Sequence, residues 1–327
     1  MRLYRCALIV GLAGMGAVLA VGRSGWARQE KDAQVRPDVG VGASLHGKRV
    51  FPADNPWNTD ISKMPVDPQS DILVASIGAD KPLHPDFGTV YNGNPNGIPY
   101  LVLSGEQAKK RFPVTFQYAD ESDPGPVPIP LDAPIEGGPK ADGDRHVLVL
   151  DRDRWILYEL WSATPQSGRW KAGSGAIFDL NSNKERPLGW TSADAAGLPV
   201  FPGLVRCDEA VEAKDIPHAL RFTCVRSRRA FVAPARHFAS KLTDEKFPPM
   251  GMRVRLKASV DIRSYPLTAQ VILRALQRYG MILADNGSDW FVSGAPDPRW
   301  NDDELNTLKR LKGRDFEVVK MGAMVTK

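Results

Sequence analysis

The residues best suited to chemistry gather at the open end of a predicted β-hairpin over residues 142–161, DGDRHVLVLDRDRWILYELW. Two runs rich in Val, Leu and Ile flank a polar tetrapeptide that fits a four-residue turn. Pairing across that turn puts His146 opposite Glu159, and it puts Asp144 opposite Trp161. Opposed side chains share one face of a sheet. The pattern therefore predicts two acids, an imidazole and an indole at one rim.

Such a rim fits acid/base cleavage of a polysaccharide. Glycosidases need two carboxyl groups, one of which is kept protonated, often by burial against an indole. Glu159 beside Trp161 is our candidate acid. The candidates for the second carboxylate are Asp144, Asp86 and Asp194.

Two other interpretations of these residues stay open. A polysaccharide lyase needs a base, an acid and a cation that neutralises a uronate. The sequence offers these candidates for those roles: His146, His237, Tyr158, Arg236 and Lys257. Alternatively, Glu159 and His146 form only a cross-strand charge pair, which contributes less than about 1 kcal/mol.

His84 and Asp86, in the segment HPDFG, form a second candidate pair. On an extended segment they share a face as acid/base or metal partners, whereas on a turn Asp86 is a cap. The segment 179–183, DLNSN, lacks the glycine and the distal acid of an EF-hand loop. We predict no metal and no cofactor, and the chain has no serine-hydrolase elbow, Walker loop, dinucleotide fingerprint or HExxH motif.

Several tryptophans stand beside Asp or Asn in polar segments, as in GWTSAD and PRWNDD. Sugar-binding loops have this pattern, and so do well-capped loops. We assign Trp161 and Trp190 as candidate sugar platforms, with Arg236, Lys257 and Asp194 as further candidate substrate-binding residues.

The N-terminus predicts export. Residues 1–27 combine a basic start, an apolar run and a small-x-small cleavage site, as secretory signal peptides do. We expect a secreted or periplasmic protein with no stable membrane insertion after removal of the signal. The whole chain carries a net charge of +5, of which Arg2, Arg5 and Arg23 contribute three, so the remainder carries +2. The sequence has no basic stripe interleaved with aromatics, so we expect no nucleic-acid partner.

Two cysteines, Cys207 and Cys224, follow the predicted signal. In an oxidising compartment, and without CxxC spacing, this pair predicts a disulfide, which would add roughly 3 kcal/mol to stability. Two free or metal-binding thiols are the alternative.

Short β-branched and aromatic runs dominate the middle of the chain, and helical periodicity comes late, over residues 267–279 and 302–311. We predict a mainly β chain of the α+β class, an antiparallel sandwich or curved sheet resembling a jelly roll, with two C-terminal helices. A flexible lead-in over residues 28–50 precedes a single domain over residues 51–320, and residues 321–327 form a tail.

Four stretches resemble a widespread family of exported bacterial proteins: HPDFG, DRHVLVLDRD followed by YELW, FDLNSN with GWTSADAAGLPVFPGLVR, and YGMILADNGS. The resemblance extends from about residue 51 to residue 316. It implies an exported single-domain protein and carries no catalytic assignment.

Taken together, the residues favour a secreted carbohydrate-active enzyme, a glycoside hydrolase or polysaccharide lyase, whose partner is a polysaccharide or other cell-envelope glycan. A noncatalytic carbohydrate- or envelope-binding module is the second hypothesis, and a structural exported protein is the third. A cleft shared by His84, Asp86, His146 and Glu159 would favour the enzyme, and scattered positions would count against it.

Overall fold

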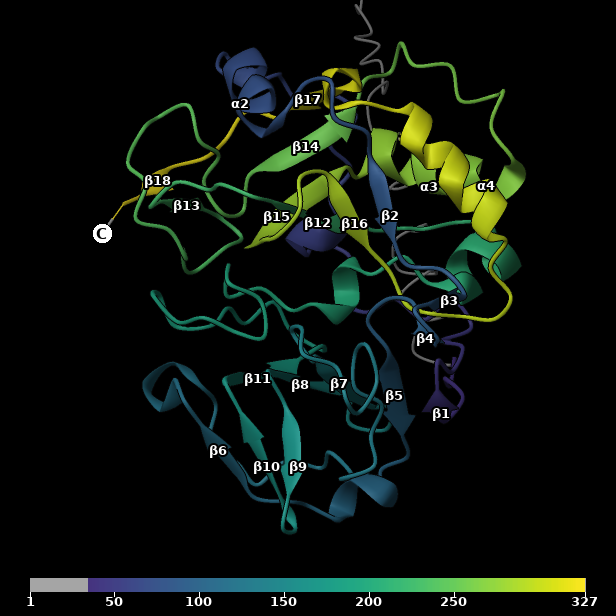
Figure 1. The fold of residues 1–327 in the computed structure, drawn as a ribbon, viewed down its shortest axis with the longest axis vertical. Coiled ribbons are helices and arrows are strands. Elements are labelled where there is room, and N and C mark those ends of the chain that lie inside the picture. The colour runs from purple at the N-terminus through teal and green to yellow at the C-terminus, as the bar shows by residue number, and fades with distance from the viewer. Residues whose placement is uncertain (1–34, 327) are drawn as a thin grey trace, which may run out of the picture.

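The computed structural model describes residues 35–326, so the predicted signal peptide lies outside the described residues. The chain is mainly β, as predicted. Its strands form two lobes, one at the bottom and one at the top of Figure 1. We call them the lower lobe and the upper lobe.

The lower lobe contains a five-stranded and a three-stranded sheet. In spatial order, the five strands are β1 (Gly40–Val41), β5 (Tyr100–Leu103), β7 (Val147–Asp151), β8 (Ile156–Trp161) and β11 (Ser174–Asp179). The three strands are β6 (Val114–Phe116), β10 (Arg169–Ala172) and β9 (Thr164–Gln166).

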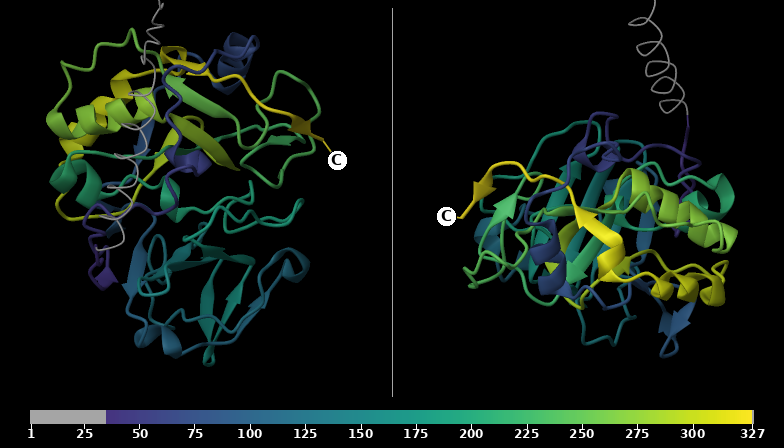
Figure 2. Two further views of the ribbon diagram at one scale, coloured as in Figure 1. Left: turned by 180° about the vertical axis from the view of Figure 1, so that it is seen from behind. Right: turned by 90° about the horizontal axis from the view of Figure 1, so that it is seen from above.

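The upper lobe contains a six-stranded sheet with helices beside it (Figures 1 and 2). In spatial order, its strands are β17 (Phe316–Val318), β14 (Arg253–Leu256), β15 (Met281–Asn286), β12 (Leu220–Cys224), β16 (Phe291–Ser293) and β2 (His84–Asp86). Two ribbons complete the described strands: β3 (Val90–Tyr91) with β4 (Asn94–Pro95), and β13 (Phe231–Val232) with β18 (Met324–Val325).

These sheets are mixed, which corrects the antiparallel prediction. β5 runs parallel to β7, and β12 runs parallel to β15. β15 and β16 follow each other in the chain, yet β12 lies between them in the sheet. The sheet order does not confirm a sandwich or a jelly roll, which stays a prediction.

The two predicted C-terminal helices are present. The first, α3 (Leu267–Arg278), buries an apolar stripe and ends before Gly280, whose φ of +66° suits a helix C-cap. The second, α4 (Asp302–Asn306), is capped by the Asn301 side chain and continues into the 3-10 turn η6 (Thr307–Arg310).

Sequence reasoning missed the other helical elements. They are α2 (Ser70–Ile77), the π-helix η5 (Asp208–Ala213), and the 3-10 turns η1 (Pro56–Asn58), η2 (Gln107–Lys109), η3 (Ala119–Glu121), η4 (Phe201–Gly203) and η7 (Gly313–Asp315). Within the described residues, no helix is both long and apolar enough to cross a membrane.

The predicted hairpin forms as β7 and β8, but its register differs from the prediction by two residues. Glu159 pairs with Leu148, not with His146, because the loop is Arg152–Trp155, with Asp151 opposite Ile156. A shift of two keeps each side chain on its predicted face.

Both faces of this hairpin are buried. Val147, Val149 and Leu160 pack in a core internal to the lower lobe. Leu148, Leu150 and Leu157 belong to a larger core that continues into the upper lobe.

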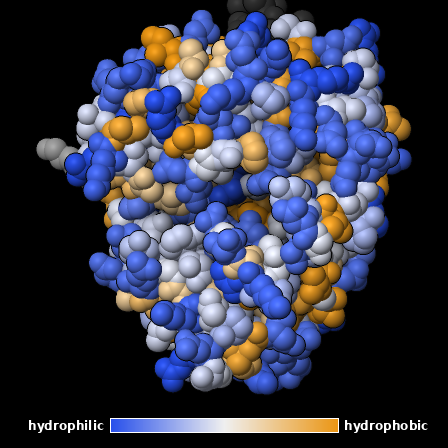
Figure 3. Space-filling model, viewed as in Figure 1, coloured by the Kyte–Doolittle hydropathy of each residue, from blue (hydrophilic) through white to orange (hydrophobic). Residues whose placement is uncertain are grey.

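Part of the predicted lead-in packs against the domain. β1 pairs with β5, Leu45 is buried, and the Leu45 amide donates to Asp208 Oδ2 at 2.9 Å. The described surface in the view of Figure 1 is mainly hydrophilic, with scattered apolar side chains (Figure 3).

Candidate active site

A cleft of about 430 Å³, which we call the central cleft, is lined by residues from both lobes. Lower-lobe segments contribute Tyr118, Glu121, Asp144 and Trp161. The upper lobe contributes His237, Asp285 and Asn286, and the connecting loop 191–195 lies between them. Segments far apart in the sequence therefore build one polar cavity, which is the usual setting of a ligand site.

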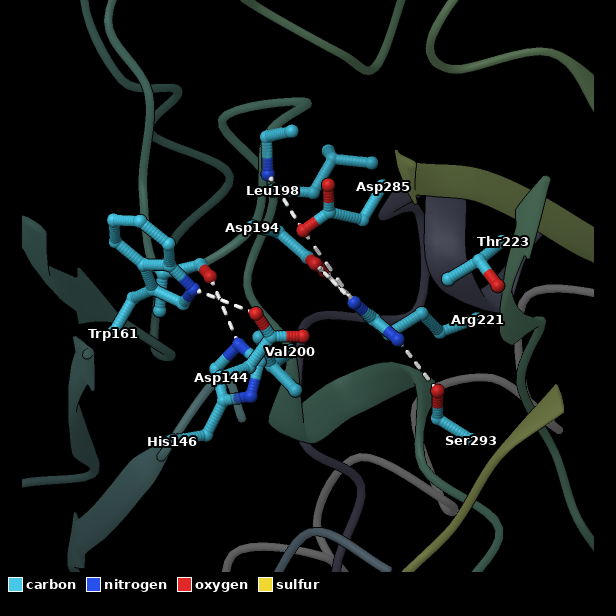
Figure 4. Close-up of polar contacts among 12 residues, drawn as sticks. Asp144, His146, Trp161, Asp194, Leu198, Val200, Arg221, Thr223, Asp285 and Ser293 are labelled. Atoms are coloured by element: carbon cyan, nitrogen blue, oxygen red, sulfur yellow. Dashed lines mark hydrogen bonds and ion pairs between the residues drawn. The ribbon is translucent and has the colours of Figure 1, made fainter. Parts of the chain in front are cut away.

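Arg221 of β12 organises the upper wall of the central cleft. Its Nε donates to both carboxylate oxygens of Asp194, at 3.0 and 2.8 Å, and its Nη1 donates to Ser293. Its Nη2 lies 3.8 Å from Asp285 Oδ2. Figure 4 shows Asp194 and Asp285 pointing toward the same side of the guanidinium and Ser293 on the other. Burial by itself would lower the pKa of Arg221, but Asp194 outweighs it and raises that pKa.

Asp285 reaches the cleft through a β-bulge. Phe222 pairs with Leu283 and the next residue, Thr223, pairs with Asp285, so Ala284 is the extra residue in β15. Bulges change the direction in which side chains point. The Ala195 amide donates to Asp285 Oδ2 at 3.3 Å, and the Asn286 amide donates to Oδ1 at 2.6 Å.

Burial, followed by repulsion from Asp194, raises the pKa of Asp285 to about 7, although Arg221 and the Asn286 amide lower it. Near neutral pH this carboxyl group is therefore protonated in a large share of molecules, whereas an ordinary aspartate is ionised.

Asp144 lies on the opposite side of the cleft, next to an aromatic wall (Figure 4). The indole Nε1–H of Trp161 donates to Asp144 Oδ1 at 3.1 Å. The ring of Tyr118 lies 6.3 Å from that of Trp161, with 30° between the planes. The expected grouping of Asp144 with Trp161 is thus present, and it faces a cavity.

His146 is buried beneath this wall and holds Glu136 in place. Its Nδ1 lies 2.6 Å from Glu136 Oε2, and its Nε2 lies 3.0 Å from the Ala193 carbonyl oxygen. Both neighbours accept hydrogen bonds, so both ring nitrogens donate and the ring is a cation. Burial by itself lowers the pKa of His146, but Glu136 outweighs it and raises the pKa to about 9.

The stretch TSADAAG, residues 191–197, forms the loop between the lobes. Ser192 Oγ lies within hydrogen-bond distance of the carbonyl oxygens of Asp194 and Leu198, which share its one proton, and it accepts from the Asp194 amide at 2.9 Å. Gly197 has a φ of +69°, and a Cβ there would lie 2.4 Å from the Trp190 carbonyl oxygen. The loop therefore requires glycine at position 197, and it places the Asp194 carboxylate next to the Arg221 guanidinium.

Glu159, our candidate acid, is not at the cleft. It is 1% exposed, and it accepts hydrogen bonds from the amides of Val200, at 3.0 and 2.9 Å, and Phe201, at 2.9 Å. Burial raises its pKa to about 7 as well, although those two amides lower it. Glu159 does not line the central cleft or either of the two neighbouring hollows, and its carboxyl group anchors the chain at the start of η4, so its role as the acid stays a prediction that this position does not favour.

The second candidate pair lies at the outer strand of the upper sheet. Asp86 of β2 lines a neighbouring hollow of about 600 Å³ that also contains Asp144 and Glu136. Burial, followed by repulsion from Glu136, raises the pKa of Asp86. His84 stacks on Phe291 at 4.0 Å, in another hollow that Asp86 also lines. His84 and Asp86 therefore share a hollow, while only Asp86 also borders the hollow next to the central cleft. None of these hollows is lined by His84, Asp86, His146 and Glu159 together, so the shared cleft that would favour the enzyme is not present among them.

The remaining predicted site residues divide between the central cleft and other places. His237 lines the central cleft, where its Nδ1 lies 2.7 Å from the Ala195 carbonyl oxygen. Trp190 packs beside Arg186, and Arg236 pairs with Glu185 at 2.6 Å.

Lys257 and Tyr158 also lie away from the central cleft. Lys257 Nζ donates to the Arg314 carbonyl oxygen at 2.8 Å, in the upper lobe. Tyr158 is buried in the core of the lower lobe. Trp190, Arg236, Lys257 and Tyr158 therefore do not line the central cleft.

The predicted disulfide is wrong. Cys207 and Cys224 are both free and buried, and the Cys224 thiol donates to the Arg226 carbonyl oxygen at 3.3 Å. Burial raises the pKa of each thiol to about 12. The spacing of the cysteines and the expected compartment do not tell whether the fold brings the two residues together. In the structure both cysteines are core side chains.

Sequence reasoning missed Asp285, Arg221 and Glu136. Asp285, in ADNGS, looked like a turn residue, and Glu136 stands in a Pro/Gly-rich loop. One signal was available for Arg221: a lone arginine in the otherwise apolar strand LRFTC needs a buried acid as its partner.

Among residues 35–326, no group of three or more His, Cys, Asp or Glu side chains is arranged to hold a metal ion. No family model, curated protein or solved structure matches the chain. The resemblance to an exported bacterial family therefore stays a prediction.

Proposed function

We propose that this protein is a glycoside hydrolase that cleaves an uncharged polysaccharide in the central cleft. The observation that carries the proposal is the carboxyl group of Asp285, which has a pKa of about 7 and faces the cleft opposite Asp144 and the aromatic rings of Trp161 and Tyr118. A carboxylic acid that stays protonated near neutral pH, across a cavity from a second carboxylate, is what glycosidic cleavage requires.

In this mechanism Asp285 gives its proton to the glycosidic oxygen while the bond from that oxygen to the anomeric carbon breaks. Asp144, held by the Trp161 indole, then acts in one of two ways. It takes a proton from a water molecule whose oxygen bonds to the anomeric carbon, or it bonds to the anomeric carbon itself, after which water displaces it and gives a proton to Asp285. The rings of Trp161 and Tyr118 offer flat surfaces on which the sugar can stack.

The charge of the cleft favours a hydrolase over a lyase. Its lining includes Glu121, Asp144, Asp194 and Asp285, and no lysine or arginine among the described residues. A uronate would meet repulsion there, because the nearby Arg221 is already paired with Asp194. The arginine, lysine and tyrosine proposed for a lyase also lie away from the cleft.

The predicted signal peptide supports a place for this activity outside the cytoplasm, on an environmental polysaccharide or a cell-envelope glycan. The second candidate is a carbohydrate-binding module, which the same aromatic wall supports. The two candidates differ in catalysis: a hydrolase needs the carboxyl groups for turnover, whereas a binding module binds the glycan without turnover.

The test compares Asp285→Asn with Glu159→Gln. Both variants change a carboxyl group with a pKa of about 7, but Asp285 is half-buried and faces the cleft, whereas Glu159 is buried away from it. Reducing ends and absorbance from new double bonds are followed on β-glucan, xylan, mannan, starch, peptidoglycan, pectate and alginate.

We expect new reducing ends without absorbance from the neutral glycans. Asp285→Asn should lower kcat by about 10²- to 10⁴-fold, while Glu159→Gln should stay close to the wild type. For the wild type, kcat/KM should fall as pH rises through about 7, because the acid is then lost. Absorbance on pectate or alginate would instead indicate a lyase, and binding without cleavage would indicate a binding module.

A further inference from the structure

The central cleft is one of three adjacent hollows. It shares Asp144 with a hollow of about 600 Å³, which we call the loop hollow. The loop hollow shares Asp86, Tyr91 and Asn96 with a third hollow of about 450 Å³, the edge hollow, beside β2. Each volume lies in the range of about 300–1,000 Å³ that suits a small ligand, so the three together exceed what a single sugar fills.

The wall of the loop hollow is polar, the wall of the edge hollow is mixed polar and apolar, and both contain amide side chains. Asn92, Asn94 and Asn96 line the loop hollow, and Asn96 and Asn306 line the edge hollow. An amide side chain both donates and accepts hydrogen bonds, which suits the hydroxyl groups of a sugar. The loop hollow is also lined by the carboxyl groups of Asp86, Glu136, Asp142 and Asp144, which can accept hydrogen bonds from sugar hydroxyls and would repel an acidic glycan.

An exposed aromatic ring stands where the two outer hollows meet. Tyr91 of β3 is 68% exposed, and it lines both of them. It lies on the short β3–β4 hairpin, so its side chain does not contribute to the buried core. A flat ring beside amide side chains is a suitable stacking surface for a sugar.

We infer that the protein binds an extended glycan chain across all three hollows, with Tyr91 as a distal sugar platform, and cleaves that chain internally. This inference rests on the proposed function, because the central cleft supplies the cleavage. The outer hollows supply binding energy from sugars remote from the cleaved bond, and such energy raises kcat/KM for long substrates over short ones.

The experiment measures chain-length dependence by calorimetric titration of Asp285→Asn, which is expected to bind without turnover. The probes are the hexasaccharides and trisaccharides of the cello, xylo, manno and malto series. Tyr91→Ala is compared with Tyr91→Phe, which keeps the ring, and with Ile72→Ala, an exposed residue of α2 that lines none of the three hollows. Viscosity and reducing ends are followed for the wild type on the matching polymer.

We expect the hexasaccharide of the preferred series to bind at least tenfold more tightly than its trisaccharide. Tyr91→Ala should weaken hexasaccharide binding by about threefold to tenfold, while Tyr91→Phe should restore most of that affinity and Ile72→Ala should match the parent. Viscosity should fall well before reducing ends accumulate.

Equal affinity for hexasaccharide and trisaccharide, or no effect of Tyr91→Ala, would overturn this inference and leave the hydrolase standing. Tight hexasaccharide binding without cleavage by the wild type would overturn the hydrolase and keep the extended binding site. If no series binds and none is cleaved, both fail.

Discussion

Asp285 and Glu159 show that a perturbed pKa does not by itself mark a catalytic group. Burial raises the pKa of both carboxyl groups to about 7. Glu159 accepts hydrogen bonds from two backbone amides in the core, while Asp285 faces a cavity that a substrate can enter. Access therefore separates the two residues, and sequence alone carries no information on access.

His146 makes a second point at this scale, because its charge is structural. It is fully buried between Glu136 and the Ala193 carbonyl oxygen, so its cationic form holds two segments of the chain together. The pKa in the folded protein, about 9, exceeds the ordinary value of 6.5. The stabilisation that protonated His146 gives to the folded protein is therefore fully present below pH 6.5 and is lost as pH rises through about 9.

We predict that the free energy of unfolding in urea falls by on the order of 3 kcal/mol between pH 6.5 and 10 because of this residue. Most of the fall should come above pH 7.5, where Asp285 and Glu159 are already mostly ionised. His146→Gln should be less stable at pH 6.5 and should show a flatter pH dependence. An equally steep fall in that variant would show that other groups cause it.

At the scale of elements, the site depends on a single arginine at the centre of the upper sheet. Arg221 on β12 contacts Asp194 on the inter-lobe loop, Asp285 on β15 and Ser293 on β16. Because Asp194 is buried, its carboxylate needs this partner. The same guanidinium lowers the pKa of Asp285, so structure and chemistry are coupled there.

We predict that Arg221→Met costs about 3–5 kcal/mol of stability in urea unfolding, because it leaves a buried carboxylate without a partner. Adding Asp194→Asn should restore part of that loss. In the single variant the alkaline limb of kcat/KM should move to higher pH, since a cation that favours ionised Asp285 is gone. If the alkaline limb of kcat/KM stays at the same pH, Arg221 does not influence the ionisation of the catalytic acid.

Sequence patterns predicted elements better than they predicted how elements pair. The hairpin and α3 were foreseen because each depends on local periodicity and turn chemistry. The insertion of β12 between β15 and β16, and the bulge that aims Asp285, depend on contacts between distant segments. Arg255 illustrates the limit: alternation in MRVRLK predicts a solvated face, yet its side chain is buried against Glu317.

At the scale of the whole molecule, the central cleft exists only because the two lobes are fixed to each other. The loop 191–197 bonds to both lobes: the His146 ring contacts the Ala193 carbonyl oxygen, and the Ala196 amide donates to Ala284. One hydrophobic cluster also contains Leu157 of the lower lobe and Leu283 of the upper lobe. Asp144 and Asp285 are therefore held on opposite walls by a shared core.

We predict that the protein unfolds in one cooperative transition, despite its two lobes. Leu157→Ala and Leu283→Ala each remove a fully buried side chain, so each should cost about 2–5 kcal/mol. If the core is shared, each variant moves the same single midpoint, and far-ultraviolet circular dichroism and tryptophan fluorescence report coincident curves. Two separated transitions, with each variant moving only its own lobe, would mean that the lobes are independent domains and that the cleft between them can open.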